Sequence, residues 1–166
     1  MGFGIFKYMT LGLVYVIAGA AIAVVTAGVG SILGVGKAGQ VGAGIITQEP
    51  EKFGKILVLE ALPGTQGIYG FLGAIMVVQK VGLLGGQIAQ ISPAIGLQLL
   101  FACLPVAIAG LFSAIYQGKV CVSGMNIVVK QPNEFGKAII LAAMVETYAI
   151  LGLLTTILLI NGINIG

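Results

Sequence analysis

Apolar residues dominate four long stretches of this chain, and polar residues gather in the short segments between them. The stretches run from about Met9 to Val35, Phe53 to Val78, Pro93 to Tyr116 and Phe135 to Ile160. Each exceeds the ~20 apolar residues that a helix needs to cross a bilayer. The first is too long for the ~7–15-residue apolar region of a signal peptide, and other spans follow it. The pattern therefore predicts an all-α membrane protein with four transmembrane helices.

The four stretches form two similar halves. A shift of 82 residues, which brings Pro50 onto Pro132, also aligns Gly28 with Gly110, Ser31 with Ser113, Lys37 with Lys119, Phe53 with Phe135, Lys55 with Lys137 and Gly70 with Gly152. Each half is predicted to be one helical hairpin, in residues 1–82 and 83–166. Two spans separate each helix from its equivalent, so the hairpins share one orientation, unlike the inverted repeats of many secondary transporters.

A single acid lies within the fourth stretch. Glu146 is the only charged residue between Lys137 and the C-terminus. It lies about 13 Å along the helix from Lys137 at ~1.5 Å per residue, near the bilayer midplane. A carboxylate at that depth costs ~3 kcal/mol or more on insertion scales, so it needs a partner and indicates a functional site. The alternative is a protonated, hydrogen-bonded structural Glu.

The two halves differ around this acid. Three of the positions that differ are, first half against second, Gly64 against Glu146, Val35 against Gln117, and Gln66 against Tyr148. One acid therefore serves two hairpins, and Thr65, Gln66 and Gln117 lie at a comparable depth. Because polar side chains inside a bilayer need partners, we expect these residues to meet Glu146.

Pro63 and Gly64 follow Leu62 in the second stretch. Proline removes a backbone donor and crowds the preceding turn, and glycine lets another chain approach closely, so the pair predicts a kink that frees a carbonyl. That carbonyl, two amide oxygens, a hydroxyl and the carboxylate would form an oxygen cage. Such a cage suits a hard cation, and one carboxylate balances one monovalent charge. The alternatives are an ordinary proline kink and interhelical amide hydrogen bonds worth ~0.6 kcal/mol.

Composition agrees with a membrane protein and removes several classes of function. The chain is 58% hydrophobic and 8% charged, whereas soluble domains carry ~25% charged residues. Histidine is absent, which excludes histidine-based catalysis and most transition-metal sites. Cys103 and Cys121 show no metal or pairing spacing, so we expect buried apolar roles. Residues 34–39 lack the Gly-Lys-Ser/Thr ending of a P-loop. We therefore predict no catalytic site, and the net charge of +3 needs no nucleic-acid partner.

All eight basic residues are lysines, and their positions predict an orientation. Two segments, residues 36–52 and 117–134, contain or adjoin most of them, namely Lys37, Lys52, Lys55, Lys119, Lys130 and Lys137. Only Lys7 and Lys80 fall on the other side. By the positive-inside rule the two segments are predicted to be cytoplasmic loops, with both termini outside a cell membrane that the chain crosses several times.

Glu60 fits the pattern less well, because it lies one turn before Gly64 where the repeat has Ala142. We expect it to reach the cytoplasmic interface or to pair with a lysine such as Lys37. The alternative is a second, proton-binding acid.

Small residues recur every four positions in the first and third stretches, at Gly19, Ala23 and Ala27, at Gly30 and Gly34, and at Ala109 and Ser113. Such spacing lets helices pack closely in lipid. It predicts that spans one and three form the inner circle of an oligomer, with spans two and four outside. The alternative is packing within a single four-helix bundle.

Three segments resemble the proteolipid of V-type rotary ATPases, in particular its sodium-transporting bacterial form, subunit K. They are Leu62-Pro63-Gly64-Thr65-Gln66-Gly67-Ile68-Tyr69-Gly70, Tyr116-Gln117-Gly118-Lys119 and Met144-Val145-Glu146-Thr147-Tyr148-Ala149. The resemblance covers almost the whole chain. It implies an ion bound by the Glu146 carboxylate, the Gln117 amide, the Thr65 hydroxyl, the Gln66 amide and the Leu62 carbonyl, with Tyr69 donating a hydrogen bond to the carboxylate.

The resemblance also implies partners. Identical copies would form a ring in the lipid that turns against a stator protein, and a central-stalk protein would bind at the cytoplasmic loops. The stator of this family carries an arginine; this chain contains none, so that charge must come from the partner.

Three functions remain open at this point. The first is the Na⁺-carrying rotor subunit of a rotary ATPase, coupled to ATP hydrolysis or synthesis elsewhere in the complex. The second is the same rotor with H⁺, which needs only the carboxyl group. The third is a self-contained cation channel or exchanger, which would pass ions when purified alone. A structural membrane spacer is disfavoured by Glu146.

Overall fold

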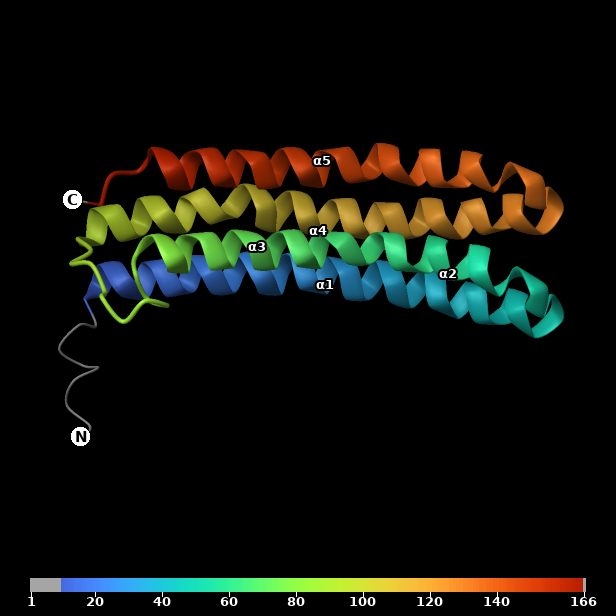
Figure 1. Ribbon diagram of the computed structural model, residues 1–166, viewed down its shortest axis with the longest axis horizontal. Helices are drawn as coiled ribbons and strands as arrows, with labels where there is room; N and C mark the ends of the chain where they lie inside the picture. Colours follow the sequence, from blue (N-terminus) through green and yellow to red (C-terminus); the bar gives the residue numbers. More distant parts are fainter. Residues whose placement is uncertain (1–9, 166) are drawn as a thin grey trace, which may run out of the picture.

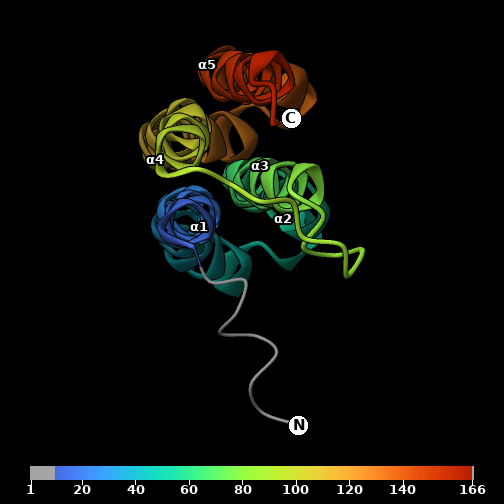
Figure 2. The same ribbon diagram turned by 90° about the vertical axis from the view of Figure 1, so that its left-hand side faces the viewer.

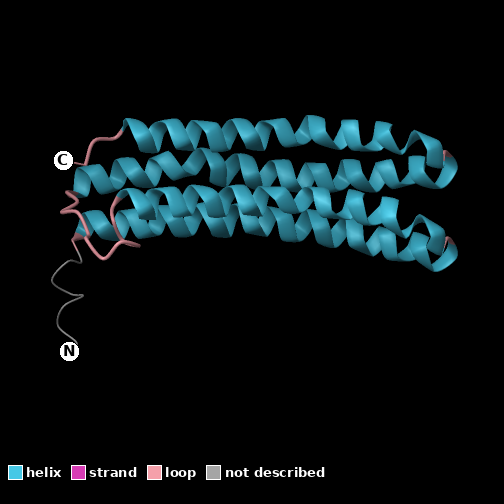
Figure 3. Cartoon of the chain, in the orientation of Figure 1, coloured by secondary structure: helices cyan, strands magenta, loops and turns pink. Residues whose placement is uncertain are grey.

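The computed structural model describes residues 10–165, which fold into long helices joined by short turns (Figure 1). Figure 3 shows helices and loops, and no strand occurs among the residues described. Four helical spans are long and apolar enough to cross a membrane: Leu11–Gln48, Pro50–Lys80, Pro93–Lys130 and Pro132–Gly162. The predicted all-α membrane fold is confirmed. The predicted start at Met9, and Lys7, lie outside the described residues.

The internal duplication is visible in the helix boundaries. Helix α4 (Pro93–Lys130) repeats α1 (Leu11–Gln48) with both ends shifted by 82 residues. The equivalent residues Thr10 and Ser92 precede these helices, and each hydroxyl accepts a hydrogen bond of 3.3 Å from a backbone N–H of the first turn. Such capping satisfies a donor that the helix itself cannot. The chain is therefore two tandem hairpins, while the boundary between residues 82 and 83 stays a prediction.

The predicted loops at residues 36–52 and 117–134 are wrong. Helix α1 continues to Gln48 and α4 to Lys130, and a turn at Glu49 or Gln131 leads into the short 3₁₀ helices η1 (Pro50–Lys52) and η3 (Pro132–Glu134). The polar residues there lie within continuous helices and do not mark a helix end. At ~1.5 Å per residue the 38-residue helices are about 57 Å long, which exceeds the ~40–45 Å of a bilayer with its headgroups.

The second span is interrupted at the predicted place. Helix α2 (Phe53–Ala61) gives way to the 3₁₀ helix η2 (Leu62–Gly64), and α3 (Thr65–Lys80) follows. Pro63 lacks the backbone donor that a regular helix needs. The equivalent helix α5 (Phe135–Gly162) has no proline and is continuous. Pro105 lies inside α4 without ending it, and the adjacent Val106 N–H donates to Thr156 Oγ1 on α5 at 3.1 Å.

Helices α1 and α4 pack side by side along their length, α3 packs against both, and α5 packs on the far side of α4 from α1 (Figure 2). Glycines make the α1–α4 contact close. A Cβ placed on Gly19, Gly30 or Gly34 would lie 2.8, 2.6 or 2.5 Å from a backbone atom of α4, so no larger residue fits at these positions. Small residues therefore bring the two backbones together in lipid.

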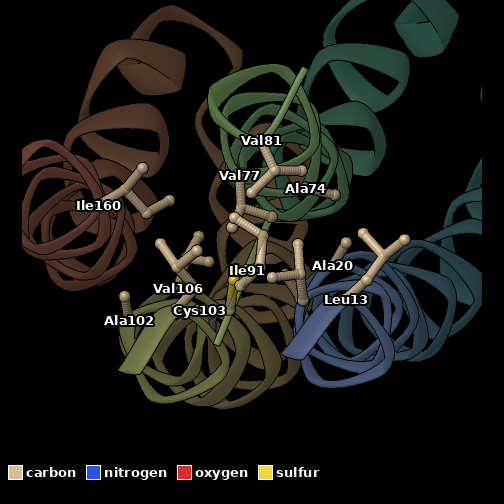
Figure 4. Close-up of a cluster of buried hydrophobic side chains, with 13 residues drawn as sticks. Leu13, Ala20, Ala74, Val77, Val81, Ile91, Ala102, Cys103, Val106 and Ile160 are labelled. Atoms are coloured by element: carbon tan, nitrogen blue, oxygen red, sulfur yellow. The ribbon is translucent and has the colours of Figure 1, made fainter. Parts of the chain in front are cut away.

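The buried apolar side chains form two clusters at opposite ends of the bundle. One lies toward the chain termini and includes Leu13, Val77 and Val106 (Figure 4). The other lies toward the hairpin tips and includes Ile56, Leu59 and Met125. Cys103 is buried in the first cluster and Cys121 in the second, which agrees with their predicted apolar role. Between the clusters lies a layer of buried polar side chains: Ser31, Gln66, Ser113 and Gln117.

Candidate ion-binding site

Glu146 is half-buried on α5, and its carboxylate faces three donors from α3 and α4. Thr65 Oγ1 donates to Glu146 Oε1 at 2.8 Å, and Tyr69 OH donates to the same oxygen at 2.7 Å. Gln117 Nε2 donates to Glu146 Oε2 at 3.3 Å. Thr65 and Tyr69 are one turn apart, so α3 presents both on one face. The structure therefore brings Thr65 and Gln117 to the acid, as expected from their depth, whereas Gln66 is linked to it only through Gln117.

Gln66 and Gln117 are fully buried behind the carboxylate and join three helices. Gln66 Nε2 donates to Gln117 Oε1 at 2.6 Å and to Ser113 Oγ at 3.3 Å. Gln117 Nε2 also donates to the Ala142 carbonyl of α5 at 3.1 Å. The amide groups therefore fix the relative positions of α3, α4 and α5 at the depth of Glu146.

One side-chain oxygen in this polar layer has no hydrogen-bond partner among the described residues. Gln66 Oε1 is buried and has no hydrogen-bond partner among residues 10–165. A buried acceptor without a partner costs ~1–3 kcal/mol, so most such groups in folded proteins are satisfied. The oxygen lies in the layer that holds Glu146. It is therefore available to a ligand that accepts electron density, such as a cation.

The Leu62 carbonyl is not freed as the sequence predicted. It accepts a hydrogen bond from the Thr65 backbone N–H and lies 3.0 Å from Thr65 Oγ1. The 3₁₀ turn provides the donor that the proline kink was expected to remove. A threonine hydroxyl has one proton, so it donates either to Leu62 or to Glu146 at a given time, and a carbonyl oxygen has two lone pairs. Leu62 can therefore still offer a lone pair next to the carboxylate.

Pro63 and Gly64, the two residues expected to support the site, differ in how closely other residues pack against them. Pro63 is buried, and a Cβ placed on Gly34 of α1 would lie 2.7 Å from its Cβ, so the kink packs tightly on α1. At Gly64, by contrast, an added Cβ would meet only Val35 Cγ2, at 3.6 Å. Within the described chain no backbone approaches Gly64 closely, and an added Cβ would make only an ordinary van der Waals contact there, so the close approach of another chain stays a prediction.

Ser113 was missed as a site residue. Its hydroxyl donates to the Val145 carbonyl at 2.9 Å and accepts from Gln66. The available signal was its spacing, because Ser113 precedes Gln117 by four residues and so shares its helix face. The site holds a single carboxylate: within the described residues, no three His, Cys, Asp or Glu side chains come together.

Glu60 does not pair with Lys37. The ion pairs among the described residues join Lys52 to Glu49 and Lys137 to Glu134. Glu60 is half-buried on α2, and a Cβ placed on Gly39 of α1 would lie 2.7 Å from Glu60 Oε1. Lys37 precedes Gly39 by two residues, so it points to a nearly opposite side of α1.

Comparisons with known proteins agree with the duplicated fold. Residues 18–77 and 100–159 each match the family of the ATP synthase C subunit. The chain is 46% identical over 149 residues to the V-type sodium ATPase subunit K of Enterococcus hirae, covering 90% of this chain and 92% of that protein. It is 41% identical over 145 residues to the A-type ATP synthase subunit K of Methanocaldococcus jannaschii, covering 87% of this chain and 61% of that protein.

Proposed function

Because this chain belongs to the ATP synthase C-subunit family, we propose that its Glu146 site binds Na⁺ and carries it across the membrane. The chain is a proteolipid, the membrane rotor subunit of a V- or A-type ATPase, and it acts in an oligomeric ring. ATP hydrolysis or synthesis takes place elsewhere in the complex. The relative from Enterococcus hirae is a sodium ATPase subunit by its name, which favours Na⁺ as the transported ion.

The unpartnered Gln66 Oε1 is the observation that carries this proposal. A proton binds to one carboxyl oxygen and gives no reason to bury a spare acceptor in the same polar layer. Na⁺ is a hard cation that takes several oxygen ligands. Oxygens of Leu62, Thr65 and Gln66 lie in the same layer as Glu146. Gln117 directs its Nε2 to the carboxylate and its Oε1 to Gln66, so its amide would turn over to offer the oxygen to a cation. One monovalent cation on one carboxylate leaves the site neutral.

Neutrality explains how the site could travel through lipid. An ionised, unpaired carboxylate is costly inside a bilayer, whereas a carboxylate with bound Na⁺ carries no net charge. Thr65 and Tyr69 would hold one carboxylate oxygen in place while the other meets the ion. At the stator, an arginine of the partner protein would pair with Glu146 and displace Na⁺. Each copy would then release one ion and take up another on each circuit.

The lysines support an orientation with the hairpin tips in the cytoplasm. The two tips lie together at one end of the bundle (Figure 1). Lys52 Nζ donates to the Val129 carbonyl at 2.9 Å, and Lys55 Nζ donates to the Pro132 carbonyl at 2.8 Å, so two lysines bind one tip to the other. Lys130 and Lys137 are exposed there. A central-stalk protein would dock on this end, and both termini would lie on the opposite side of the membrane.

Carbodiimide modification of Glu146 in the purified ring tests the choice of ion. We expect Na⁺ to slow the modification at constant pH and ionic strength, because bound Na⁺ shields the carboxylate, while K⁺ at the same concentration has a weaker effect. The modified residue is located by mass spectrometry, with Glu60→Gln protein as the matched control for labelling at the second acid. A rate that changes with pH and is indifferent to Na⁺ at every pH would assign the rotor to H⁺.

A further inference from the structure

Ser113 of α4 connects the three helices of the ion site through one hydroxyl group. The residue is buried, with 5% of its surface exposed. Its hydroxyl donates a hydrogen bond of 2.9 Å to the Val145 carbonyl, one residue before Glu146 on α5. It also accepts a hydrogen bond of 3.3 Å from Gln66 Nε2 on α3. Ser113 thus contacts the amide of one proposed ligand and the backbone next to the carboxylate, although it is not itself among the proposed ligands.

The direction of these two hydrogen bonds is fixed by the groups that form them. A backbone carbonyl can only accept, and a serine hydroxyl carries one proton. Because Ser113 donates that proton to Val145, its oxygen can only accept on the side of Gln66. The group of the Gln66 amide that faces Ser113 must therefore be a donor, which is Nε2. The amide oxygen, Oε1, is thereby directed to another side.

The second proton of Gln66 Nε2 supports the same orientation. It is donated to Gln117 Oε1 at 2.6 Å, so both protons of the amide nitrogen are used. If the Gln66 amide turned over, its Oε1 would face two acceptors, Gln117 Oε1 and the Ser113 oxygen, and both contacts would be repulsive. Gln66 Oε1 is therefore held in a buried position without a partner among residues 10–165, where such an oxygen is costly.

Cation binding removes one of these two restraints on Gln66. Gln117 directs Nε2 to Glu146 at 3.3 Å and Oε1 to Gln66, so it has to turn over before its oxygen can reach a cation. A turned Gln117 presents Nε2 toward Gln66. This favours a turn of the Gln66 amide as well, because its Oε1 could then accept from Gln117, and that turn would take Oε1 away from the cation. Ser113 is the remaining side-chain contact that opposes it.

We propose that Ser113 is a positioning residue of the ion site, which holds the Gln66 amide with Nε2 on the serine and Oε1 free for Na⁺. The inference rests on the proposed binding of Na⁺ at Glu146 and adds the residue that determines how one ligand is oriented. A proton needs only the carboxyl group of Glu146. Loss of the serine hydroxyl should therefore weaken the binding of Na⁺ and leave the binding of H⁺ unchanged.

The internal repeat provides a matched control. The equivalent of Ser113 in the first hairpin is Ser31 of α1, which is 8% exposed and also contacts α3. The Ser31 oxygen accepts a hydrogen bond of 2.8 Å from the Gly67 backbone N–H. Ser31→Ala therefore removes a buried hydroxyl from the same polar layer without removing a contact of the Gln66 amide.

Equilibrium binding of radioactive Na⁺ to purified rings tests the inference. We expect Ser113→Ala to bind Na⁺ about three- to tenfold more weakly than the wild type, which corresponds to the loss of about one hydrogen bond. In the absence of Na⁺, the pH dependence of Glu146 modification by carbodiimide should stay that of the wild type. Ser31→Ala should keep the wild-type Na⁺ affinity.

A double-mutant cycle separates positioning from packing. If Ser113 acts through the Gln66 amide, adding Ser113→Ala to a Gln66→Ala ring should not change the Na⁺ affinity further, because no amide is left to orient. Thermal dissociation of each ring measures assembly. Should Ser113→Ala fail to assemble, Ser113→Cys keeps the side-chain volume with a weakly hydrogen-bonding group and should lower the Na⁺ affinity in the same way.

Four results would overturn the positioning role and leave the Na⁺ rotor standing. They are a wild-type Na⁺ affinity in the Ser113 variants, an equal loss in Ser31→Ala, an undiminished loss in the Gln66→Ala background, and a changed pH dependence of Glu146 modification. A wild-type ring that binds no Na⁺ would overturn both the positioning role and the Na⁺ function.

Discussion

Replacing Gln117 by alanine separates ion binding from assembly. The side chain is fully buried, and its amide contacts Gln66, Ala142 and Glu146. Gln117→Ala removes the amide that contacts the Glu146 carboxylate and that would turn its oxygen to the proposed cation, and it keeps every backbone contact of α4. We therefore expect weaker Na⁺ binding by a ring that still assembles.

The magnitude follows from the contacts that are lost. A polar contact to a charged group contributes ~1.5–3 kcal/mol. Since each ~1.4 kcal/mol is a factor of ten, the Na⁺ affinity should fall about 10- to 100-fold. The links to Gln66 and Ala142 are worth ~0.6 kcal/mol each in membrane helices, so the folded chain loses roughly 1–2 kcal/mol. The α1–α4 glycine contact is untouched, which is why the ring should survive.

Equilibrium binding of radioactive Na⁺ to the purified ring measures the affinity, and thermal dissociation of the ring measures assembly. Thr156→Val is the matched control, because Thr156 Oγ1 also joins α5 to α4 from a buried position but lies away from Glu146. It should lower thermal stability and leave Na⁺ affinity unchanged. Unchanged affinity in Gln117→Ala, together with a ring that falls apart, would make Gln117 a packing residue and refute the oxygen cage.

Two further substitutions test whether Glu146 and Glu60 carry ions. Glu146→Gln should give an assembled ring that no longer transports Na⁺, because the neutral amide cannot balance the charge of a bound cation or pair with the stator arginine. Wild-type rates of radioactive Na⁺ uptake into vesicles with the complete complex would contradict this. Glu60→Gln should leave Na⁺ uptake and affinity unchanged, because its carboxyl lies against Gly39 rather than at Glu146; a loss of transport would give Glu60 a part in carrying ions.

Hydrophobic patterning and the repeat were sufficient to predict the four spans, the duplication and the meeting of polar groups at Glu146. These features follow from two strong constraints, the length of a bilayer-spanning helix and the cost of an unpaired polar group in lipid. The helix ends at residues 36–52 were mispredicted because glycine, lysine and glutamine lower hydropathy without ending a helix. Hydropathy reports where the membrane stops, and the backbone continues past it.

The detailed geometry of the site could not be predicted from the sequence, because it depends on local backbone conformation and on contacts between helices. The Leu62 carbonyl keeps a hydrogen-bond donor because the chain tightens into a 3₁₀ turn at Pro63. A proline in the sequence does not by itself show whether the carbonyls near it find new donors. Ser113 was passed over because serine is common in membrane helix packing. The position of Glu60 depends on a missing side chain at Gly39 of another helix, a contact that no spacing within α2 encodes.

Gly64 has a consequence for the energetics of the whole machine. If each hairpin kept an acid, every copy passing the stator could exchange two ions; with glycine at position 64, the proposed mechanism gives one ion per copy. For a fixed number of ATP molecules per revolution, the free energy of each ATP would then be divided among about half as many ions. Each ion could be moved against about twice the electrochemical difference. On the proposed mechanism, the missing carboxylate would lower the number of ions moved per turn and raise the gradient that the rotor can sustain.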